Sequence, residues 1–332
     1  MLRIGLLGAA KIAPAAIIKP AKECPEAHIV AVAARDLARA KAFAARHDIL
    51  RVYDSYAALL SDPEIDAVYN PLPNGLHGEW AIAAMRAGKH VLCEKPVAAN
   101  ADEARAMAAT ARETGRVLVE AFHYRYHPLA QRMADIVASG ELGKIERVES
   151  TMCFPLPIFS DIRYRFDLAG GATMDAGCYA VHMARLVGGP DAEVVSASAK
   201  LRDPNVDRAM EAELRFKSGA TGHVTVSMWS GKLLGLSLRV IGSEGEMRAI
   251  NPVMPQLWHR LTVRGKVGKR VETFGRRPSY LYQLEGFIDA CLHGKPVLTP
   301  IEDGILNMAV IDDIYRAAGL PVRRPTASFR AA

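Results

Sequence analysis

The sequence lacks the features that mark secreted, metal-binding and membrane-spanning proteins. It contains only five cysteines, namely Cys24, Cys93, Cys153, Cys178 and Cys291. Because they are odd in number and far apart, neither a disulfide framework nor a zinc site with closely spaced ligands is expected. No apolar run reaches the roughly 18 residues of a membrane span, and the first residues read as a strand and a glycine turn instead of a signal peptide. We therefore expect reduced, mostly buried thiols, no metal site, no membrane association and a cytoplasmic location.

The charge distribution gives no sign of a nucleic-acid surface. There are 42 lysines and arginines against 36 acidic residues, and the basic residues are spread along the chain instead of gathering in one stripe. The 332 residues are enough for about two domains. Neither an internal repeat nor a low-complexity linker separates them. A small molecule is therefore the expected partner.

The first third of the chain alternates between short apolar runs and helix-like segments. The apolar runs read as strands, at residues 2–7, 27–34, 65–70, 90–93 and 117–121. Helices are expected between them, including 37–46, 53–60, 78–87 and 101–114. This alternation predicts an α/β Rossmann domain with a parallel, doubly wound sheet. We expect this domain to span residues 1–122 and a second domain to span 123–332.

The turn after the first strand partly matches the dinucleotide-binding pattern G-x-G-x-x-G/A. Gly8 and Ala13 fit its ends, and Ala10 replaces the middle glycine with the smallest side chain that could let a pyrophosphate approach the backbone. The candidate cofactor-binding residues here are Gly8, Ala9, Ala10, Lys11 and Ile12. A tight strand-to-helix turn without a ligand explains the same residues, because this motif alone is a weak indication.

The residues after the second strand bear on the choice of cofactor. Arg35 lies about twenty residues beyond the glycine turn, where dinucleotide folds contact the adenosine ribose. A guanidinium there suits a 2′-phosphate through planar, charge-assisted hydrogen bonds. The neighbouring Asp36 caps the following helix, which we favour, or reaches the ribose and permits NAD(H). NADP(H) is the favoured cofactor, and NAD(H) stays open.

Polar side chains also follow two later strands. Glu94 and Lys95 come directly after the strand at 90–93, and Pro96 stiffens the turn that aims them. Asn74 and His77 follow the strand at 65–70, at the same edge of the sheet. In open α/β sheets, ligands bind in the crevice outside this edge. A solvated surface turn and an ordinary helix-start histidine are the alternative interpretations.

In the second half of the chain, the regular alternation of strands and helices gives way to consecutive strand-like segments. Strand-like segments with turn residues between them predict antiparallel pairing, at residues 148–154, 194–201, 210–216, 222–229, 236–241 and 260–264. Helices are expected at 127–140, 280–293 and 303–318. A further helix follows Gly170-Gly171 and carries Asp175, Tyr179 and His182 at i, i+4 and i+7, so that they share one face. Half-buried packing of the tyrosine and an ion pair of the aspartate would explain them without catalysis.

Five stretches in the right order give the chain a specific resemblance. They are Gly8-Ala-Ala-Lys-Ile-Ala13, Asn70-Pro-Leu-Pro-Asn-Gly-Leu-His77, Ala87-Gly-Lys-His-Val-Leu-Cys-Glu-Lys-Pro96, Glu120-Ala-Phe-His-Tyr-Arg-Tyr-His-Pro128 and Gly170-Gly-Ala-Thr-Met-Asp-Ala-Gly-Cys-Tyr-Ala-Val-His182. Over nearly its whole length the sequence resembles the glucose–fructose oxidoreductase, inositol dehydrogenase and rhizopine-catabolism (Gfo/Idh/MocA) family. The resemblance implies a Rossmann domain followed by an α/β domain with a large, open, mostly antiparallel sheet. It also implies a homodimer or homotetramer formed through that sheet.

The resemblance further implies roles for individual residues. Lys95 corresponds to the family's active-site lysine, and Tyr179 is the residue expected in the glucose–fructose oxidoreductase and dihydrodiol/xylose dehydrogenase branch, where the inositol dehydrogenases carry histidine. The catalytic candidates are Lys95, Tyr179 and Asp175. The cofactor-binding candidates beyond the glycine turn and Arg35 are Leu72, Pro73, Asn74, His77, Glu94, Lys95 and Arg125. The substrate-binding candidates are Lys95, Arg125, Asp175, Tyr179 and, more weakly, His182.

The mechanistic hypothesis is hydride transfer between nicotinamide and a sugar, polyol or related diol. A free tyrosine has a pKa near 10, so a positively charged Lys95 close to Tyr179 would help it to act as a base. Asp175 would orient Lys95 or bind a substrate hydroxyl. Two alternatives stay open: an enzyme that keeps its NADP and shuttles hydride between two sugars, and a regulator that senses NAD(P) without turnover. The retained Lys95 and Tyr179 favour catalysis.

Overall fold

The structure, a computed structural model, describes residues 1–266 and 268–326, which pack into two compact units. Of these residues, the first unit holds 1–123, 280–304 and 325–326, and the second holds 124–279 and 305–324. The packing therefore differs from a single division near residue 122. The chain returns to the first unit because Thr299 donates to the Glu120 carbonyl at 2.6 Å and Thr326 donates to the Gly75 carbonyl at 2.7 Å.

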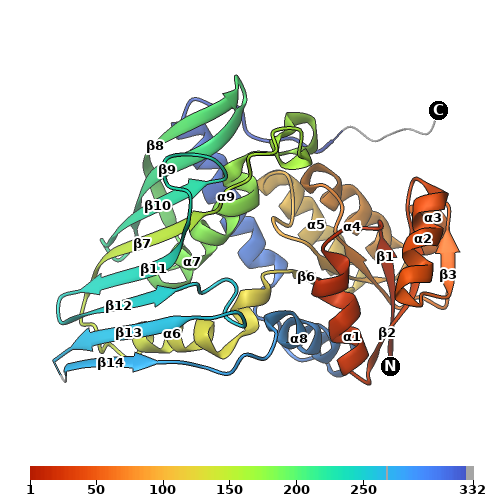
Figure 1. The fold of residues 1–332 in the computed structure, drawn as a ribbon, viewed down its shortest axis with the longest axis horizontal. Coiled ribbons are helices and arrows are strands. Elements are labelled where there is room, and N and C mark those ends of the chain that lie inside the picture. Colours follow the sequence, from red (N-terminus) through yellow and green to blue (C-terminus); the bar gives the residue numbers. More distant parts are fainter. Residues whose placement is uncertain (267, 327–332) are drawn as a thin grey trace. The chain divides into compact units, whose positions relative to one another are not determined.

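The first unit is built on a six-stranded, fully parallel sheet (Figure 1). Its strands, in spatial order, are β3 (Arg51–Tyr53), β2 (Ala27–Ala33), β1 (Leu2–Leu7), β4 (Ala67–Asn70), β5 (His90–Cys93) and β6 (Leu118–Glu120). The central strands are almost entirely buried, which explains their continuous apolar runs. The strand order reverses between β1 and β4, and this confirms the predicted doubly wound sheet.

Helices connect these strands, and polar side chains begin several of them. The helical segments of the unit are η1 (Pro14–Ile18), α1 (Lys19–Glu23), α2 (Leu37–His47), α3 (Tyr56–Leu60), η2 (Asn74–Leu76), α4 (His77–Arg86), α5 (Ala101–Thr114) and α8 (Ser279–His293). Asp36 accepts from the Arg39 amide at 3.1 Å, so it caps α2 as favoured from the sequence. The helix expected over 53–60 is shorter, because Tyr53 ends β3 and Ser55 caps α3.

The second unit is built on an eight-stranded sheet. Within the described part of this sheet, β7 and β10 pair in parallel, and all other neighbouring strands are antiparallel. The strands, in spatial order, are β14 (Gly268–Glu272), β13 (Arg260–Gly265), β12 (Gly245–Ile250), β11 (Gly235–Gly242), β7 (Ile145–Cys153), β10 (Thr221–Ser227), β9 (Val206–Phe216) and β8 (Ala192–Asp203). The large, mostly antiparallel sheet is confirmed. The sequence patterns missed β12 and β14, in which charged side chains interrupt the apolar pattern.

Helices cover one face of this sheet (Figure 1). They are α6 (Pro128–Ala138), α7 (Cys178–Gly188) and α9 (Ile301–Ala317), and α7 packs directly on β7, β10 and β11. The side chains beneath them, such as Val148, Val224 and Val240, are buried. No described helix packs on the opposite face, which presents charged and hydroxyl side chains. Three short helical segments, η3 (His123–Tyr126), η4 (Ile162–Tyr164) and η5 (Phe166–Leu168), lie in the connections.

The composition led to expectations about thiols, membrane spans and metal sites, and the structure can be compared with each. All five thiols are free, and all but Cys291 are buried. In the described part of the chain, no helix is both long and apolar enough to cross a membrane. Within the same residues, no group of three or more His, Cys, Asp or Glu side chains is placed to hold a metal ion.

A fully buried ion pair joins distant parts of the second unit. Arg323 donates from Nη2 to Oδ1 of Asp207 at 3.0 Å, and both side chains are completely buried. The other oxygen of Asp207 accepts from the amide and the hydroxyl of Thr173 at 2.6 and 2.7 Å. Arg323 also donates to the Gly170 carbonyl at 2.7 Å. The pair thereby fixes the turn at Gly170-Gly171, from which the helix of Asp175 and Tyr179 starts.

The turn itself leaves no room for a side chain. Gly171 has φ +138°, and a Cβ atom there would lie 2.2 Å from the Asp207 carboxylate. Glycine is therefore required both by the backbone conformation and by the close approach of the ion pair.

Arg323→Met is expected to lower the free energy of unfolding by about 3–5 kcal/mol, because it leaves the Asp207 carboxylate buried without its charge partner. Urea unfolding of the purified protein measures the change. Arg324→Met is the matched control, because Arg324 is exposed and its replacement should alter the unfolding free energy by less than about 0.5 kcal/mol. Equal effects of the two substitutions would show that the buried ion pair does not stabilise the fold more than an exposed arginine does.

Candidate functional site

The turn after β1 provides a row of backbone donors. Gly8 adopts φ +102°, and a Cβ atom there would lie 3.3 Å from the Leu72 side chain, so the turn requires glycine. The amides of residues 9–12 donate to no acceptor among the described residues. Consecutive free amides at the start of a helical segment form a ready site for phosphate oxygens. This arrangement fits the pyrophosphate of a dinucleotide at the residues that the sequence singled out.

Two guanidinium groups lie near this turn. Arg35 follows β2 and is exposed, as the sequence led us to expect. Arg39, one helical turn further on, donates to the Ala9 carbonyl at 2.8 Å and so lies directly at the glycine turn. The charges of Arg35 and Arg39 both act on the buried Tyr56 hydroxyl, although burial is the larger influence and raises the pKa of Tyr56. The sequence analysis missed Arg39 and Tyr56; the i, i+4 spacing of the two arginines was the available indication.

Hydrogen bonds hold the Glu94-Lys95-Pro96 turn on both sides of Lys95. Glu94 accepts from the Tyr69 hydroxyl at 2.7 Å, and its amide donates to the Asn70 carbonyl at 3.0 Å. One residue beyond the cis Lys95-Pro96 peptide bond, the Val97 amide donates to the buried Glu120 carboxylate at 2.9 Å. Neighbouring strands thus fix the backbone that carries Lys95.

His77 contributes to the same turn. It is buried, its Nδ1 lies 2.8 Å from the Pro96 carbonyl, and its Nε2 lies 2.7 Å from the Leu72 carbonyl. Burial lowers the pKa of His77 to about 4, although the two carbonyls act in the opposite direction. A neutral ring donates to only one of these carbonyls. His77 therefore connects the turn after β4, with Leu72, Pro73 and Asn74, to the turn after β5.

The second unit holds the remaining catalytic candidates. Asp175 lies in a π-helical turn, η6 (Thr173–Gly177), which continues into α7 with Tyr179 and His182. The hydroxyl of the buried Tyr124 lies 2.5 Å from Nδ1 of His182, and its ring centroid lies 5.9 Å from that of Tyr179. Tyr124 therefore packs against Tyr179 and His182 together, and it is a residue that sequence reasoning missed.

The other two substrate candidates of this unit have identified partners. Asp175 forms an ion pair with Arg163, at 3.1 Å between Oδ2 and Nε. Arg125 donates to the Gln131 side chain at 3.3 Å. Lys95 and Tyr179 belong to different units, and their catalytic cooperation stays a prediction.

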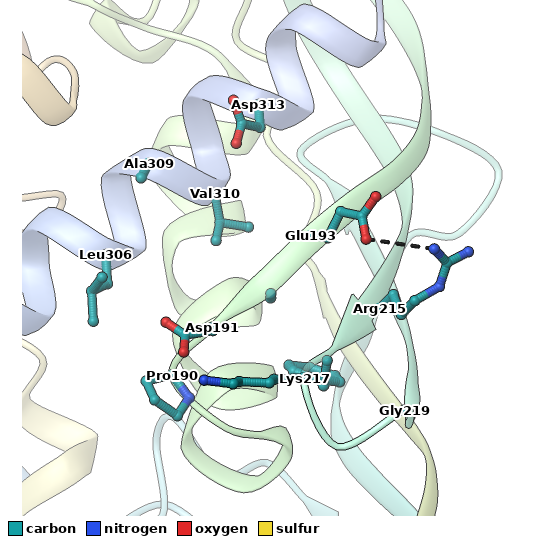
Figure 2. A pocket seen from close by; sticks show the side chains of 12 residues that line it. Pro190, Asp191, Glu193, Arg215, Lys217, Gly219, Leu306, Ala309, Val310 and Asp313 are labelled. Carbon is teal, nitrogen blue, oxygen red and sulfur yellow. Dashed lines mark hydrogen bonds and ion pairs between the residues drawn. The ribbon is translucent and has the colours of Figure 1, made fainter.

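A separate hollow in the second unit holds none of these residues. It has a volume of about 590 Å³ and lies between α9 and the strands β8 and β9 (Figure 2). Its apolar floor includes Leu306 and Val310, and Arg215 and Glu193 pair at its rim. Its charged lining residues include Asp191, Lys217 and Asp313, but neither a tyrosine nor a histidine lines it, so it is not a candidate site for the proposed proton transfer.

Two family descriptions match the chain. Residues 2–122 match "Oxidoreductase family, NAD-binding Rossmann fold", and residues 130–248 match "GFO/IDH/MocA C-terminal domain". The first match covers the sheet of the first unit, and the second covers strands β7 to β11 and the start of β12 in the second unit.

Individual proteins are similar over almost the full length. A D-xylose 1-dehydrogenase (NADP(+)) of Haloferax volcanii is 42% identical over 96% of this chain and 97% of its own. The crystal structure of KijD10, a 3-ketoreductase from Actinomadura kijaniata in complex with NADP and TDP-benzene, aligns with a TM-score of 0.88 at 30% identity, covering 95% of this chain and 97% of the other. An aldose-aldose oxidoreductase from Caulobacter crescentus aligns with a TM-score of 0.88 at 25% identity, covering 96% and 97%.

Proposed function

The chain belongs to the Gfo/Idh/MocA family of oxidoreductases, and from this premise we propose that it is an NADP(H)-dependent dehydrogenase or reductase of sugars or related diols. The observation that carries the proposal is the fixed Glu94-Lys95-Pro96 turn, held by Tyr69, His77 and Glu120 at the sheet edge that also bears the free amides of residues 9–12. Backbone amides suited to a pyrophosphate and a lysine on a fixed turn, both at one edge of the sheet, support hydride transfer to or from a nicotinamide. The similarity to an NADP(+)-dependent D-xylose dehydrogenase supports an aldose as the first substrate to try.

Each candidate residue has a separate role in the proposed reaction. A nicotinamide cofactor, when bound, would supply the hydride chemistry. Tyr179 removes the hydroxyl proton in oxidation and returns it in reduction, while the positive charge of Lys95 favours the ionised phenol. Tyr124 packs against the Tyr179 ring. Asp175 binds a substrate hydroxyl or orients Lys95.

Tyr179→Phe is expected to slow hydride transfer by about 100- to 10,000-fold, because it removes the proton-transferring hydroxyl and little else. Single-turnover absorbance at 340 nm, with NADP⁺ or NAD⁺ and a panel of aldoses and diols, measures this rate. Tyr53→Phe is the control: its hydroxyl donates to Asp62 beside the edge strand β3, and transfer should be unchanged. An unchanged rate in Tyr179→Phe would remove this residue from the mechanism.

The same panel separates the other candidate functions. The similarity to an aldose-aldose oxidoreductase favours a hydride shuttle as the second candidate. A shuttle would retain NADP through gel filtration and oxidise one sugar only when another is present. Nucleotide binding without turnover of any sugar or diol would instead indicate a regulator.

Arg35→Gln and Arg39→Gln are each expected to raise the KM for NADP⁺ by about 10- to 100-fold, because a charge-assisted contact to the 2′-phosphate is lost. The KM for NAD⁺, which lacks that phosphate, should change by less than about threefold by the same reasoning. Steady-state kinetics with both cofactors test this. Arg46→Gln, at the exposed end of α2, should leave both constants unchanged. Parallel increases for NADP⁺ and NAD⁺ would contradict a 2′-phosphate contact.

We also propose that the protein forms a homodimer or homotetramer through the uncovered face of its eight-stranded sheet. Arg248, Arg260, Arg264 and Lys269 lie at the β12–β14 end of that face, and no described carboxylate forms an ion pair with any of them. At the opposite end, β9 contributes Glu211 and Glu213, beside the ion pair of Glu193 with Arg215. A two-fold axis would place the basic end of one copy against the acidic end of the other.

Light scattering at micromolar protein concentration is therefore expected to give a multiple of the 36.0 kDa chain mass. The double substitution Arg248→Glu/Arg264→Glu should shift the protein toward monomer, because like charges would then meet across the interface. Arg46→Glu changes the charge of an exposed residue in the other unit and should have no effect. A monomeric wild-type protein would overturn the proposed assembly.

A further inference from the structure

A second charged side chain lies beside the candidate carboxylate of the second unit. In the segment that precedes the helix of Asp175, Nε of Arg163 lies 3.1 Å from Oδ2 of Asp175. Nη1 of Arg163 lies 3.2 and 3.3 Å from the two oxygens of Asp161. The guanidinium thus lies between two carboxylates, and Asp175 is the main cause that raises the pKa of Arg163.

The backbone holds Arg163 and Asp175 in a fixed relation. The carbonyl of Arg163 accepts from the Gly171 amide at 2.7 Å, and the Gly171 carbonyl accepts from the Asp175 amide at 3.0 Å. A Cβ atom at Gly170 would lie 2.6 Å from the same Arg163 carbonyl, so the two segments are in close contact. The buried Asp207–Arg323 pair fixes this turn from the other side. The backbone that carries the Arg163 side chain is therefore fixed relative to the helix of Asp175.

One part of the Arg163 guanidinium remains available. Nε and Nη1 contact the two carboxylates, whereas Nη2 has no hydrogen-bond or ion-pair partner among the described residues. The side chain also keeps 46% of its surface accessible. Arg165 makes a useful comparison in the same segment, because its Nε and Nη2 both contact Asp167 and no contact joins it to Asp175.

We propose that Arg163 is a substrate-binding residue whose Nη2 donates a hydrogen bond to the substrate oxygen next to the reacting CH–OH carbon. This inference rests on the proposed function and deepens it, because it specifies the substrate as a neutral vicinal diol. Two adjacent hydroxyls present both a hydrogen and a lone pair, which match a carboxylate beside a guanidinium donor. Two carboxylates around one guanidinium disfavour an anionic group at this position.

The test compares a neutral aldose with its 2-deoxy analogue. D-Xylose, or whichever aldose the substrate panel selects, and its 2-deoxy form are assayed with NADP⁺ for kcat and KM. Wild-type protein should prefer the hydroxylated sugar by about 10- to 100-fold in kcat/KM, the range for a hydrogen bond to a charged group. In Arg163→Gln this preference should fall to within about threefold, because the deoxy sugar never used that donor. Arg165→Gln should keep the full preference.

The Arg163→Lys variant distinguishes a hydrogen bond to the substrate from a role in which Arg163 only balances the charge of Asp175. A lysine retains the positive charge beside Asp175 but has a single ammonium head, which cannot contact the carboxylate and the substrate in the guanidinium geometry. We expect Arg163→Lys to recover part of kcat without recovering the preference for the hydroxylated sugar. Dissociation constants of both sugars for the NADPH-loaded protein, which cannot oxidise them, should show the same pattern in titration calorimetry.

The outcomes distinguish this inference from the proposed function. If Arg163→Gln weakens turnover of both sugars equally and keeps the wild-type preference, Arg163 only supports the structure and the proposal is wrong. The same conclusion follows if Arg165→Gln loses as much preference as Arg163→Gln. If wild-type protein neither binds nor turns over any sugar or diol, the proposed function fails, and the substrate contact fails with it.

Discussion

The buried Asp207 carboxylate is the contact on which the second unit's candidate site depends. It accepts from Thr173 at the start of the helix and pairs with Arg323 near the other end of the chain. Removing two charged groups from water is costly, so such a pair is retained only where further hydrogen bonds satisfy both partners. Here the partners include the backbone of the Gly170-Gly171 turn. The positions of Asp175 and Tyr179 therefore follow from an interaction between residues that are 116 positions apart.

The first unit fixes its lysine in a comparable way. The Asn70 carbonyl and the Glu120 carboxylate hold the backbone on either side of Lys95, and the Tyr69 hydroxyl holds the Glu94 side chain. The imidazole of His77 connects two loops at the same edge. In both units the candidate side chain is thus carried on backbone that buried hydrogen bonds hold in place, which is what the proposed chemistry requires.

Sequence reasoning identified most elements but missed those whose own residues are poor indicators. Strand β3 has only three residues, and charged side chains interrupt the apolar pattern of β12 and β14, so their pairing depends on the neighbouring strands. Arg39 and Arg163 were missed for a similar reason. A single arginine on a helix or in a loop resembles any surface residue until a carbonyl or a carboxylate is placed beside it.

By itself, the sequence determined the alternation of strands and helices, the glycine turn and the ordered motifs that identify the family, and it favoured the cap at Asp36. These are properties of neighbouring residues, because periodicity, backbone preference and motif spacing act over short stretches. Only the tertiary structure decided that Arg323 reaches Asp207, that His77 spans two loops and that Arg163 lies beside Asp175. Such contacts close long loops, and nothing in the local sequence records which distant residue completes a hydrogen bond.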